Sequence, residues 1–356
     1  MRTAIIGLPM TGKTSLFTIL TGVHESTRIG SMETRVGVAK VPDPRLEALA
    51  KIFNPPKVTH AVVEYVDFPA ISKEALRDPS CLASMRVVDA LAHVLRVFED
   101  PTVPHEKGSV DPLRDRDDVD TELILSDLVV VEKRLERVEK DRKKIRNPEL
   151  DQEHDLLLRC KQMLEDNQPL REMTLSAEDE KRIRGFQFLS QKPMLYVLNL
   201  GEEDAARLRE IESSYREKLG ARPNTGIAAV CGKIEAELAE LSREEAAEMM
   251  GSYGLAEPGL ERVITATYSL LGLMSFLTAG DTEVRAWTIP QHSTAVKAAG
   301  AIHSDFEKKF IRAEVVNWQH LVDHNGYHGL REKALLKLEG KEYIVRDGDV
   351  LVIRHS

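Results

Sequence analysis

Cysteine is scarce in this sequence of 356 residues, and the three cysteines at positions 81, 160 and 231 lie far apart. An odd number of separated cysteines excludes a disulfide framework and has no zinc-site spacing, so we expect a reducing, cytoplasmic location. The sequence also lacks an apolar run of ~18 residues, the length that a membrane helix requires. The apolar run after Arg2 is too short for a signal peptide, and no membrane partner is expected.

Positive charge is in deficit, because 49 Lys and Arg stand against 58 Asp and Glu and give a formal net charge of −9. Such a chain does not coat nucleic acid by bulk attraction, so any contact with RNA needs a local basic patch. Hydrophobic residues make up 42% of the sequence, which is enough for well-packed cores. The length indicates two or three domains.

The most informative stretch follows the apolar run TAIIG near the start of the chain. Residues 7–14 read GLPMTGKT, a full match to the phosphate-binding pattern G-x-x-x-x-G-K-[ST]. Gly7 and Gly12 allow backbone N–H groups to face phosphate oxygens. Lys13 is expected to reach the β- and γ-phosphates, and the Thr14 hydroxyl is expected to bind Mg²⁺. A chance glycine-rich turn is the alternative, which the preceding strand and the following helix disfavour.

A second metal ligand is expected at the end of another strand. Residues 61–70 read AVVEYVDFPA, an apolar strand that ends in Asp67. A carboxylate in this place holds Mg²⁺ in P-loop enzymes, whereas an Asp after a strand is otherwise most often a turn residue or a helix cap. Together with the phosphate loop, Asp67 is predicted to serve the metal.

Further apolar strands are predicted over residues 90–98 and 193–200, and their alternation with helices indicates a doubly wound α/β sheet. Ligands of such sheets bind at the carboxyl ends of the strands, where Asn199 and Glu202 stand in the run NLGE. GTP-binding folds carry Asn-Lys-x-Asp at this place. The longer Glu side chain argues against ordinary guanine recognition.

These motifs resemble those of the YchF/Obg-like ATPases, a family of translation-associated P-loop proteins. The stretches that carry the resemblance extend over nearly the whole chain: GLPMTGKTSLF, VGVAKVPDPRLEAL, VDPLRD with DTELILSDLVVVEKRLERVEK, NLGE, FLTAGDTEVRAWTI with AAGAIHSDFEKKFIRAEV, and LEGKEYIVRDGDV. The stretches from FLTAGDTEVRAWTI onwards are similar to the family's C-terminal TGS domain, and NLGE is similar to the family's Asn-x-x-Glu variant of the base-reading motif.

The resemblance implies ATP binding and hydrolysis with Mg²⁺, a cytosolic location and association with the ribosome. It implies a nucleotide site built from Gly7, Pro9, Met10, Thr11, Gly12, Lys13, Thr14, Ser15, Asn199, Glu202 and Cys231. It implies metal ligation by Thr14, Ser31 and Asp67, and catalytic roles for Lys13, Ile71 and His105. For His105 the alternative is a solvent-exposed loop residue. For Cys231 the alternative is a small buried thiol.

Three departures from the family pattern bear on activity. Met10 stands where the family has an Asn that helps to coordinate potassium, and a thioether is a poor ligand for a hard cation. The family's D-x-x-G is D-F-P-A here, so Pro69 removes a donor and Ala70 restricts φ. The region 71–85 has no glycine, unlike the family's switch II. We expect nucleotide binding with weakened hydrolysis or switching.

An inserted antiparallel helical hairpin is predicted from Leu123, with a seam formed by Ile124, Leu128, Val131, Leu135, Val138 and Ile145 on the first helix and by Leu150, Leu157 and Leu164 on the second. The pair Asn147-Pro148 is expected to end the first helix. That helix carries a run of basic residues: Lys133, Arg134, Arg137, Lys140, Arg142, Lys143, Lys144 and Arg146. They form either a solvated face or a contact with ribosomal RNA or tRNA.

The last ~80 residues have the size of a β-grasp module. They are predicted to contain a strand over 283–289, a helical region over 293–311 and a hairpin over 341–354 around Asp347-Gly348. The aromatic residues Trp287, Phe306 and Phe310 are expected in the core rather than in an RNA-facing patch with Arg285, Lys308, Lys309 and Arg312.

The resulting prediction is a P-loop NTPase domain in two parts, residues 1–121 and 185–275, interrupted by the helical hairpin of residues 122–184 and followed by a TGS domain over residues 276–356. The predicted function is a ribosome-associated ATPase. A non-hydrolysing, nucleotide-sensing module that docks on the ribosome or on RNA is the alternative, and a GTP-binding protein is a third. The sequence leaves the oligomeric state open.

Overall fold

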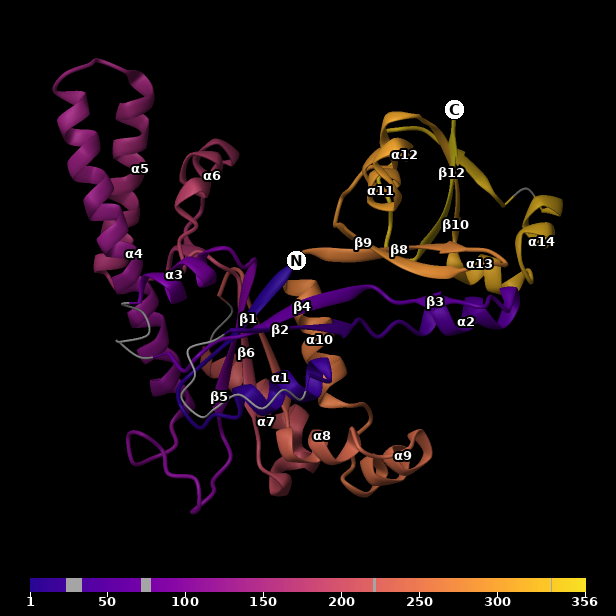
Figure 1. Ribbon diagram of the computed structural model, residues 1–356, viewed down its shortest axis with the longest axis horizontal. Coiled ribbons are helices and arrows are strands. Elements are labelled where there is room, and N and C mark those ends of the chain that lie inside the picture. Colours follow the sequence, from indigo (N-terminus) through magenta and orange to yellow (C-terminus); the bar gives the residue numbers. More distant parts are fainter. Residues whose placement is uncertain (24–33, 72–77, 220–221, 334) are drawn as a thin grey trace. The chain divides into compact units, whose positions relative to one another are not determined.

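The computed structural model describes residues 1–23, 34–71, 78–219, 222–333 and 335–356 (Figure 1). The chain divides into two compact units. The first unit consists of residues 1–37 and 64–267, and the second consists of residues 38–63 and 268–356. Residues 38–63 join the C-terminal part of the chain, which no pattern in the sequence indicates, and the domain bounds given above stay a prediction.

The first unit is built around a mainly parallel sheet. Among the described residues its strand order is β2-β4-β1-β5-β6-β7. The strands are β1 (Arg2–Ile6), β2 (Arg35–Lys40), β4 (Val62–Asp67), β5 (Ala90–Arg96), β6 (Met194–Asn199) and β7 (Thr225–Val230). Every residue of β5 and β6 is buried, as expected for apolar strands covered on both faces of a parallel sheet. The α/β fold class is confirmed.

Helices connect these strands: α1 (Lys13–Thr21), α3 (Pro79–Arg86), α7 (Leu208–Leu219), α8 (Gly232–Leu238), α9 (Arg243–Ser252) and α10 (Gly259–Leu270), with short 3-10 turns at η2 (Leu170–Glu172), η3 (Arg184–Phe186) and η4 (Glu202–Arg207). The amphipathic pattern of residues 258–274 predicts one helix over that range, but the observed helix α10 is shorter. It ends at Leu270 because Gly272 takes a left-handed φ of +62° and the next strand begins at Leu273. Within the described ranges, no helix has both the length and the apolar composition needed to cross a bilayer.

The helical hairpin lies between β5 and β6 in the chain, and its arms α4 (Pro112–Arg142) and α5 (Pro148–Glu165) run antiparallel (Figure 1). The first arm begins eleven residues before the expected start at Leu123, because the Asp111 side chain caps it and Pro112 occupies its first position. It also ends at Arg142, before the expected Asn147-Pro148 boundary. The Asn147 side chain instead caps α5 by accepting from the Glu149 N–H.

The expected seam packs the two arms together over most of its length. Its buried members are Ile124, Val131, Leu135, Val138, Leu157 and Leu164, joined by Leu156 and Cys160. Ile145 does not belong to it, because this residue lies in the turn between the arms and is 64% exposed. After α5 the chain forms α6 (Ala177–Ile183), whose N-cap Ser176 accepts a hydrogen bond from the Asp179 N–H.

The second unit is a mixed sheet with helices packed on it. Its strand order, within the residues described, is β11-β10-β12-β8-β9-β3. The strands are β3 (Val58–Thr59), β8 (Leu273–Ala279), β9 (Val284–Pro290), β10 (Phe310–Asn317), β11 (Lys337–Glu339) and β12 (Asp349–His355). The helices are α2 (Pro44–Phe53), α11 (Ala295–Ile302), α12 (Ser304–Lys308), α13 (Trp318–Asp323) and α14 (Tyr327–Glu332). Helix α11 packs on β9 and β10, as expected for a β-grasp arrangement.

Two local predictions for this unit need correction. The region 293–311 is not helical throughout, because strand β10 begins at Phe310. The hairpin expected over 341–354 is wrong: β12 pairs with β10 and β8, and residues 341–348 form no strand. Asp347 instead accepts from the Ser275 N–H and from Arg45, which holds the turn against β8 and α2. Trp287, Phe306 and Phe310 pack in or against the core, as predicted.

Candidate nucleotide-binding site

The loop between β1 and α1 has the backbone shape of a phosphate cradle. Gly7 has φ +149° and Gly12 has φ +90°, and a Cβ on Gly12 would lie 2.4 Å from Asn199 Nδ2. A Cβ on Gly7 would lie 2.7 Å from the Val94 carbonyl oxygen. Glycine is therefore required at both positions. Gly12 is the N-cap of α1 and makes no side-chain cap, so the positive end of this helix is left facing the loop.

The loop folds around its own lysine. Lys13 Nζ donates to the Leu8 carbonyl oxygen at 2.6 Å, and the residue is only 8% exposed. Burial lowers the pKa of Lys13 to about 8, and the charge of Asp67 opposes that shift. A phosphate group in the loop would add negative charge beside the ammonium and favour its protonated form. Pro9, Met10, Thr14 and Ser15 are exposed around the same loop, with Met10 at 61%.

The two described candidates for metal ligation lie together. Thr14 Oγ1 donates to Asp67 Oδ2 at 3.1 Å, because β4 pairs with β1 and brings Asp67 beside Ile5 at the base of the loop. In the part of the chain that is described, Asp67 Oδ1 is buried without a hydrogen-bond partner. A hydroxyl and a carboxylate with a spare oxygen fit Mg²⁺, which prefers one or two such ligands completed by water and phosphates. The third candidate, Ser31, lies outside the described residues.

An arginine that the sequence analysis missed also reaches this carboxylate. Arg35 Nη2 lies 2.5 Å from Asp67 Oδ2, and the guanidinium stands over the Phe17 ring at 5.0 Å from its centroid. Arg35 is a single arginine outside any recognisable motif, so the sequence contains no signal that would place it in the site.

Asn199 ties the phosphate loop to the opposite side of the site. Its Nδ2 donates to the Thr11 carbonyl oxygen at 3.0 Å, and its Oδ1 accepts from the Gly232 N–H at 3.0 Å. Glu202 lies at the start of η4 and forms an ion pair of 2.9 Å with Lys233, a residue that the sequence analysis did not single out. The expected base-reading acid therefore already has a cationic partner.

Cys231 is the N-cap of α8, and its side chain is buried with Ala205 and Ile234. Burial raises the pKa of this thiol, so it is neutral near pH 7 and behaves as a small apolar group. Its place after β7 lies at the same edge of the sheet as Asn199. A role in nucleotide binding remains a prediction.

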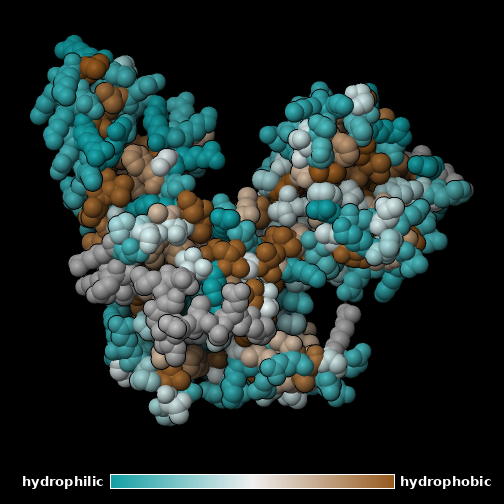
Figure 2. Space-filling model, in the orientation of Figure 1, coloured by the Kyte–Doolittle hydropathy of each residue, from teal (hydrophilic) through white to brown (hydrophobic). Residues whose placement is uncertain are grey.

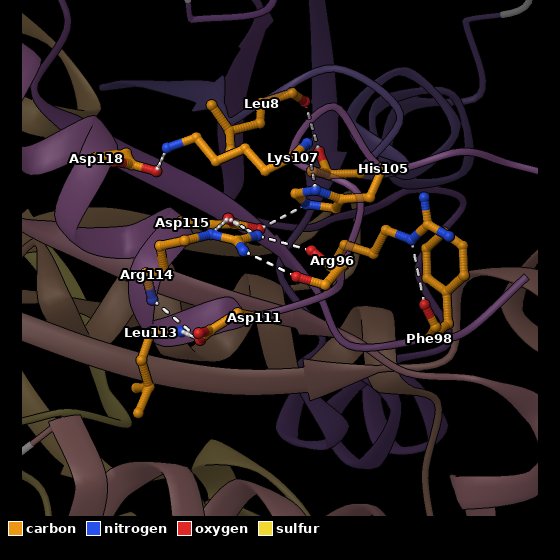
Figure 3. A network of polar contacts seen from close by, with 12 residues as sticks. Leu8, Arg96, Phe98, His105, Lys107, Asp111, Leu113, Arg114, Asp115 and Asp118 are labelled. Carbon is orange, nitrogen blue, oxygen red and sulfur yellow. Dashed lines mark hydrogen bonds and ion pairs between the residues drawn. The ribbon is translucent and has the colours of Figure 1, made fainter.

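The two further catalytic candidates are buried by other parts of the fold. Ile71 belongs to the core beside Leu8, while its N–H donates to the Gly7 carbonyl oxygen at 2.9 Å. His105 Nε2 contacts Asp115 Oδ2 at 2.8 Å, and its Nδ1 accepts from the Lys107 N–H, so both ring nitrogens are engaged (Figure 3). The alternative of a solvent-exposed His105 is wrong. The catalytic roles of both residues stay predictions.

Another buried arginine shapes the same edge of the sheet. Arg96, the last residue of β5, donates to the Phe98 and Val103 carbonyl oxygens at 3.2 and 2.8 Å and stands over the Phe98 ring (Figure 3). It therefore holds the loop that leads to His105. Because Arg96 is in register with Asn199, this loop starts beside the residue that braces the phosphate loop.

Comparison with known proteins finds relatives that match over nearly the whole chain. The family model YchF-GTPase_C, described as "Protein of unknown function (DUF933)", matches residues 273–356. The chain is 39% identical to the "Ribosome-binding ATPase YchF" of Haemophilus influenzae and 38% identical to that of Bacillus subtilis, and each match covers 99% of this chain and 98% of the relative. Among solved structures, the YchF GTPase of Schizosaccharomyces pombe matches with a TM-score of 0.84 and 28% identity, over 99% of this chain and 97% of that one. The chain belongs to the YchF family.

Proposed function

We propose that this protein binds Mg²⁺·ATP in the loop of residues 7–14, hydrolyses it slowly and associates with ribosomes in the cytosol. The observation that carries the proposal is the loop itself, whose two glycines, buried lysine and open helix end form an anion site beside Asp67. The YchF relatives named as ribosome-binding ATPases support the same assignment.

The residues of the site divide the work of phosphoryl transfer. Lys13 is placed to leave the Leu8 carbonyl oxygen and pair with the β- and γ-phosphates, and the loop amides neutralise the same oxygens. Thr14 and Asp67 would hold Mg²⁺, which would supply further neutralisation of the phosphate charge. A water molecule attacks the γ-phosphorus in line while the bond from this phosphorus to the β,γ-bridging oxygen breaks, so that ADP leaves and the water's proton passes to the phosphate product or to solvent. Lys13 and the loop amides stabilise the negative charge that develops on the phosphate oxygens.

Slow hydrolysis follows from what surrounds the attacking water. Ile71 is apolar and buried, and His105 is held by Asp115, so neither side chain presents a free polar group for that water. Pro69 adds no N–H at the place where the family pattern has a flexible switch. Single-turnover hydrolysis at a rate typical of the family would contradict this part of the proposal.

Selection of the base rests on Glu202. A guanine base would need this carboxylate to accept from its N1 and N2 groups, and the ion pair with Lys233 competes for the same oxygens. We therefore propose a preference for ATP. Calorimetric titration of ATP against GTP, each with Mg²⁺, tests it. A tenfold preference for GTP, equal to about 1.4 kcal/mol, would overturn the assignment.

Contact with ribosomal RNA is proposed for the turn of the hairpin. Arg134 and Arg142 on the first arm are already paired with Glu153 and Asp151 at 2.7 and 2.6 Å. The neighbouring Lys143, Lys144 and Arg146 have no ion pair within the described residues. The visible face of this hairpin is largely hydrophilic (Figure 2), as expected of a surface that meets phosphate groups rather than an apolar partner.

Ribosome pelleting tests this assignment. Changing residues 143, 144 and 146 to Gln should weaken binding and lower its salt dependence, because each lost phosphate contact removes about 0.7 to 0.9 from the slope of log K against log salt. The matched control changes Arg134 and Arg142 to Gln, whose charges are already used within the hairpin. Losses in proportion to the three and the two charges removed would mean that total charge alone matters.

The same assay separates an ATPase cycle from a non-hydrolysing sensor. In an ATPase cycle, the amount of protein that pellets with ribosomes should differ between ATP and ADP. The Lys13→Ala variant should abolish that difference. Unchanged pelleting in all three conditions would favour a docking module instead.

A further inference from the structure

Arg35 forms an ion pair with Asp67, the carboxylate of the proposed metal site. It belongs to β2, the neighbour of β4 in the sheet, and its guanidinium contacts Asp67 Oδ2 at 2.5 Å. Both side chains are at least nine-tenths buried, with 9% and 8% exposed. The Phe17 ring from α1 supports the guanidinium on another side, which holds the cation in place through a cation–π contact.

We infer that Arg35 is a resident counter-ion of Asp67, which Mg²⁺ must displace or share when the nucleotide binds. The inference rests on the proposed function, since it concerns the same metal site. It makes Arg35 a positioning residue, because the guanidinium acts on the metal through the carboxylate.

The hydrogen bonds of the site show why the two cations compete. Asp67 Oδ2 accepts hydrogen bonds from both Arg35 and the Thr14 hydroxyl. This oxygen is therefore already bound by one cation and by the other proposed metal ligand. Oδ1, which has no partner in the described structure, is the remaining acceptor. A second cation at this carboxylate is repelled by the first, and the repulsion is strong where both are buried.

The arginine also explains how a buried acid persists without metal. An uncompensated carboxylate in a buried place is costly, and a guanidinium with an aromatic support satisfies its charge. The fold is therefore stabilised in its metal-free form. The consequence is a weaker coupling between Mg²⁺ and the nucleotide than an unoccupied carboxylate would give.

The experiment measures ADP affinity by calorimetry in EDTA and in saturating Mg²⁺, so no turnover is involved. The ratio of the two dissociation constants is the metal coupling. Arg35→Met removes the charge and keeps an aliphatic stem against Phe17, and Arg35→Gln removes the charge and keeps a hydrogen-bond donor. In either variant we expect the coupling to rise about tenfold over the wild type, equal to about 1.4 kcal/mol. The metal-free melting temperature should fall, and Mg²⁺·ADP should restore it.

A matched control comes from the same sheet. Arg2 forms an ion pair of 2.5 Å with Glu64, also between neighbouring strands, but its side chain is 53% exposed and it stands at the end of β1 that is opposite to the phosphate loop. Arg2→Gln should leave the metal coupling unchanged, so it separates a local effect from a general loss of charge.

Three outcomes are decisive. If the wild type binds no purine nucleotide with or without Mg²⁺, the proposed function fails and the inference loses its site. If the wild type binds but the Arg35 variants keep its coupling within twofold, the inference alone is overturned. If the variants lose ADP affinity equally with and without Mg²⁺, Arg35 contacts phosphate rather than opposing the metal, which also overturns it.

Discussion

Replacing Gly12 by alanine tests the phosphate loop at its tightest point. Gly12 has φ +90°, a conformation that costs an L-residue roughly 1–2 kcal/mol. The added Cβ would also stand 2.4 Å from Asn199 Nδ2, so the Asn199 amide must move. That movement breaks its hydrogen bonds with the Thr11 carbonyl oxygen and the Gly232 N–H, each worth about 1 kcal/mol. The expected loss of unfolding free energy is therefore about 3–4 kcal/mol.

The same variant should lose at least about tenfold in affinity for Mg²⁺·ATP, because the displaced Asn199 amide braces the phosphate loop at the Thr11 carbonyl oxygen; such a loss equals about 1.4 kcal/mol. Urea denaturation and calorimetry measure the two effects separately. Gly22→Ala is the matched control, since Gly22 ends the same helix with φ +69° and has open space around its Cβ position. It should show only the backbone strain and normal ATP binding. The reasoning is refuted if the Gly12 variant binds ATP within twofold of the wild type and is as stable as the Gly22 variant.

Three further predictions concern buried charge and base selection. Asp127 is fully buried and accepts two backbone N–H groups and an arginine, so Asp127→Ala should cost about 3–5 kcal/mol in urea denaturation, whereas Asp118→Ala on the surface should cost less than about 1 kcal/mol. Burial, reinforced by neighbouring cations, lowers the pKa of His93 to about 3. The unfolded chain therefore binds a proton at this histidine that the folded protein does not bind. The free energy of unfolding should fall as the pH drops from about 6.5 towards 3, by up to about 1.4 kcal/mol per pH unit. His93→Phe should flatten that dependence, and an unchanged slope would contradict the cause. Lys233→Ala should free Glu202 and raise GTP affinity relative to ATP by up to about fivefold in calorimetry, and a shift towards ATP would show that the ion pair does not oppose guanine.

Much of the fold was predictable because its signals are local. The phosphate loop is a contiguous motif whose glycines determine the backbone, and the buried strands β5 and β6 read as apolar runs. The helical hairpin followed from its heptad spacing, although its start was missed. The helix-start signal Asp111-Pro112 was present in the sequence and predicts the observed start of α4.

The errors arose where the partner of a segment is distant in the sequence. The turn at Asp347-Gly348 has the composition of a hairpin turn, but β12 takes its partners from β10 and β8, so the local signal was misleading. Residues 38–63 pack with the C-terminal unit because β3 pairs with β9 and α2 packs on the same sheet. A pattern of apolar residues predicts that a face is buried, and it does not name the element that buries it.

By itself, the sequence determined the phosphate loop, the acid at the end of β4 and the asparagine at the end of β6, because strand ends of a parallel sheet meet at one edge. Only the tertiary structure decided which side chains these groups would contact. Arg35 reaches Asp67, Lys233 reaches Glu202 and Asp115 holds His105 through strand order, register and loop path. Such pairings depend on distances between elements far apart in the chain, and local propensity carries no information about those distances.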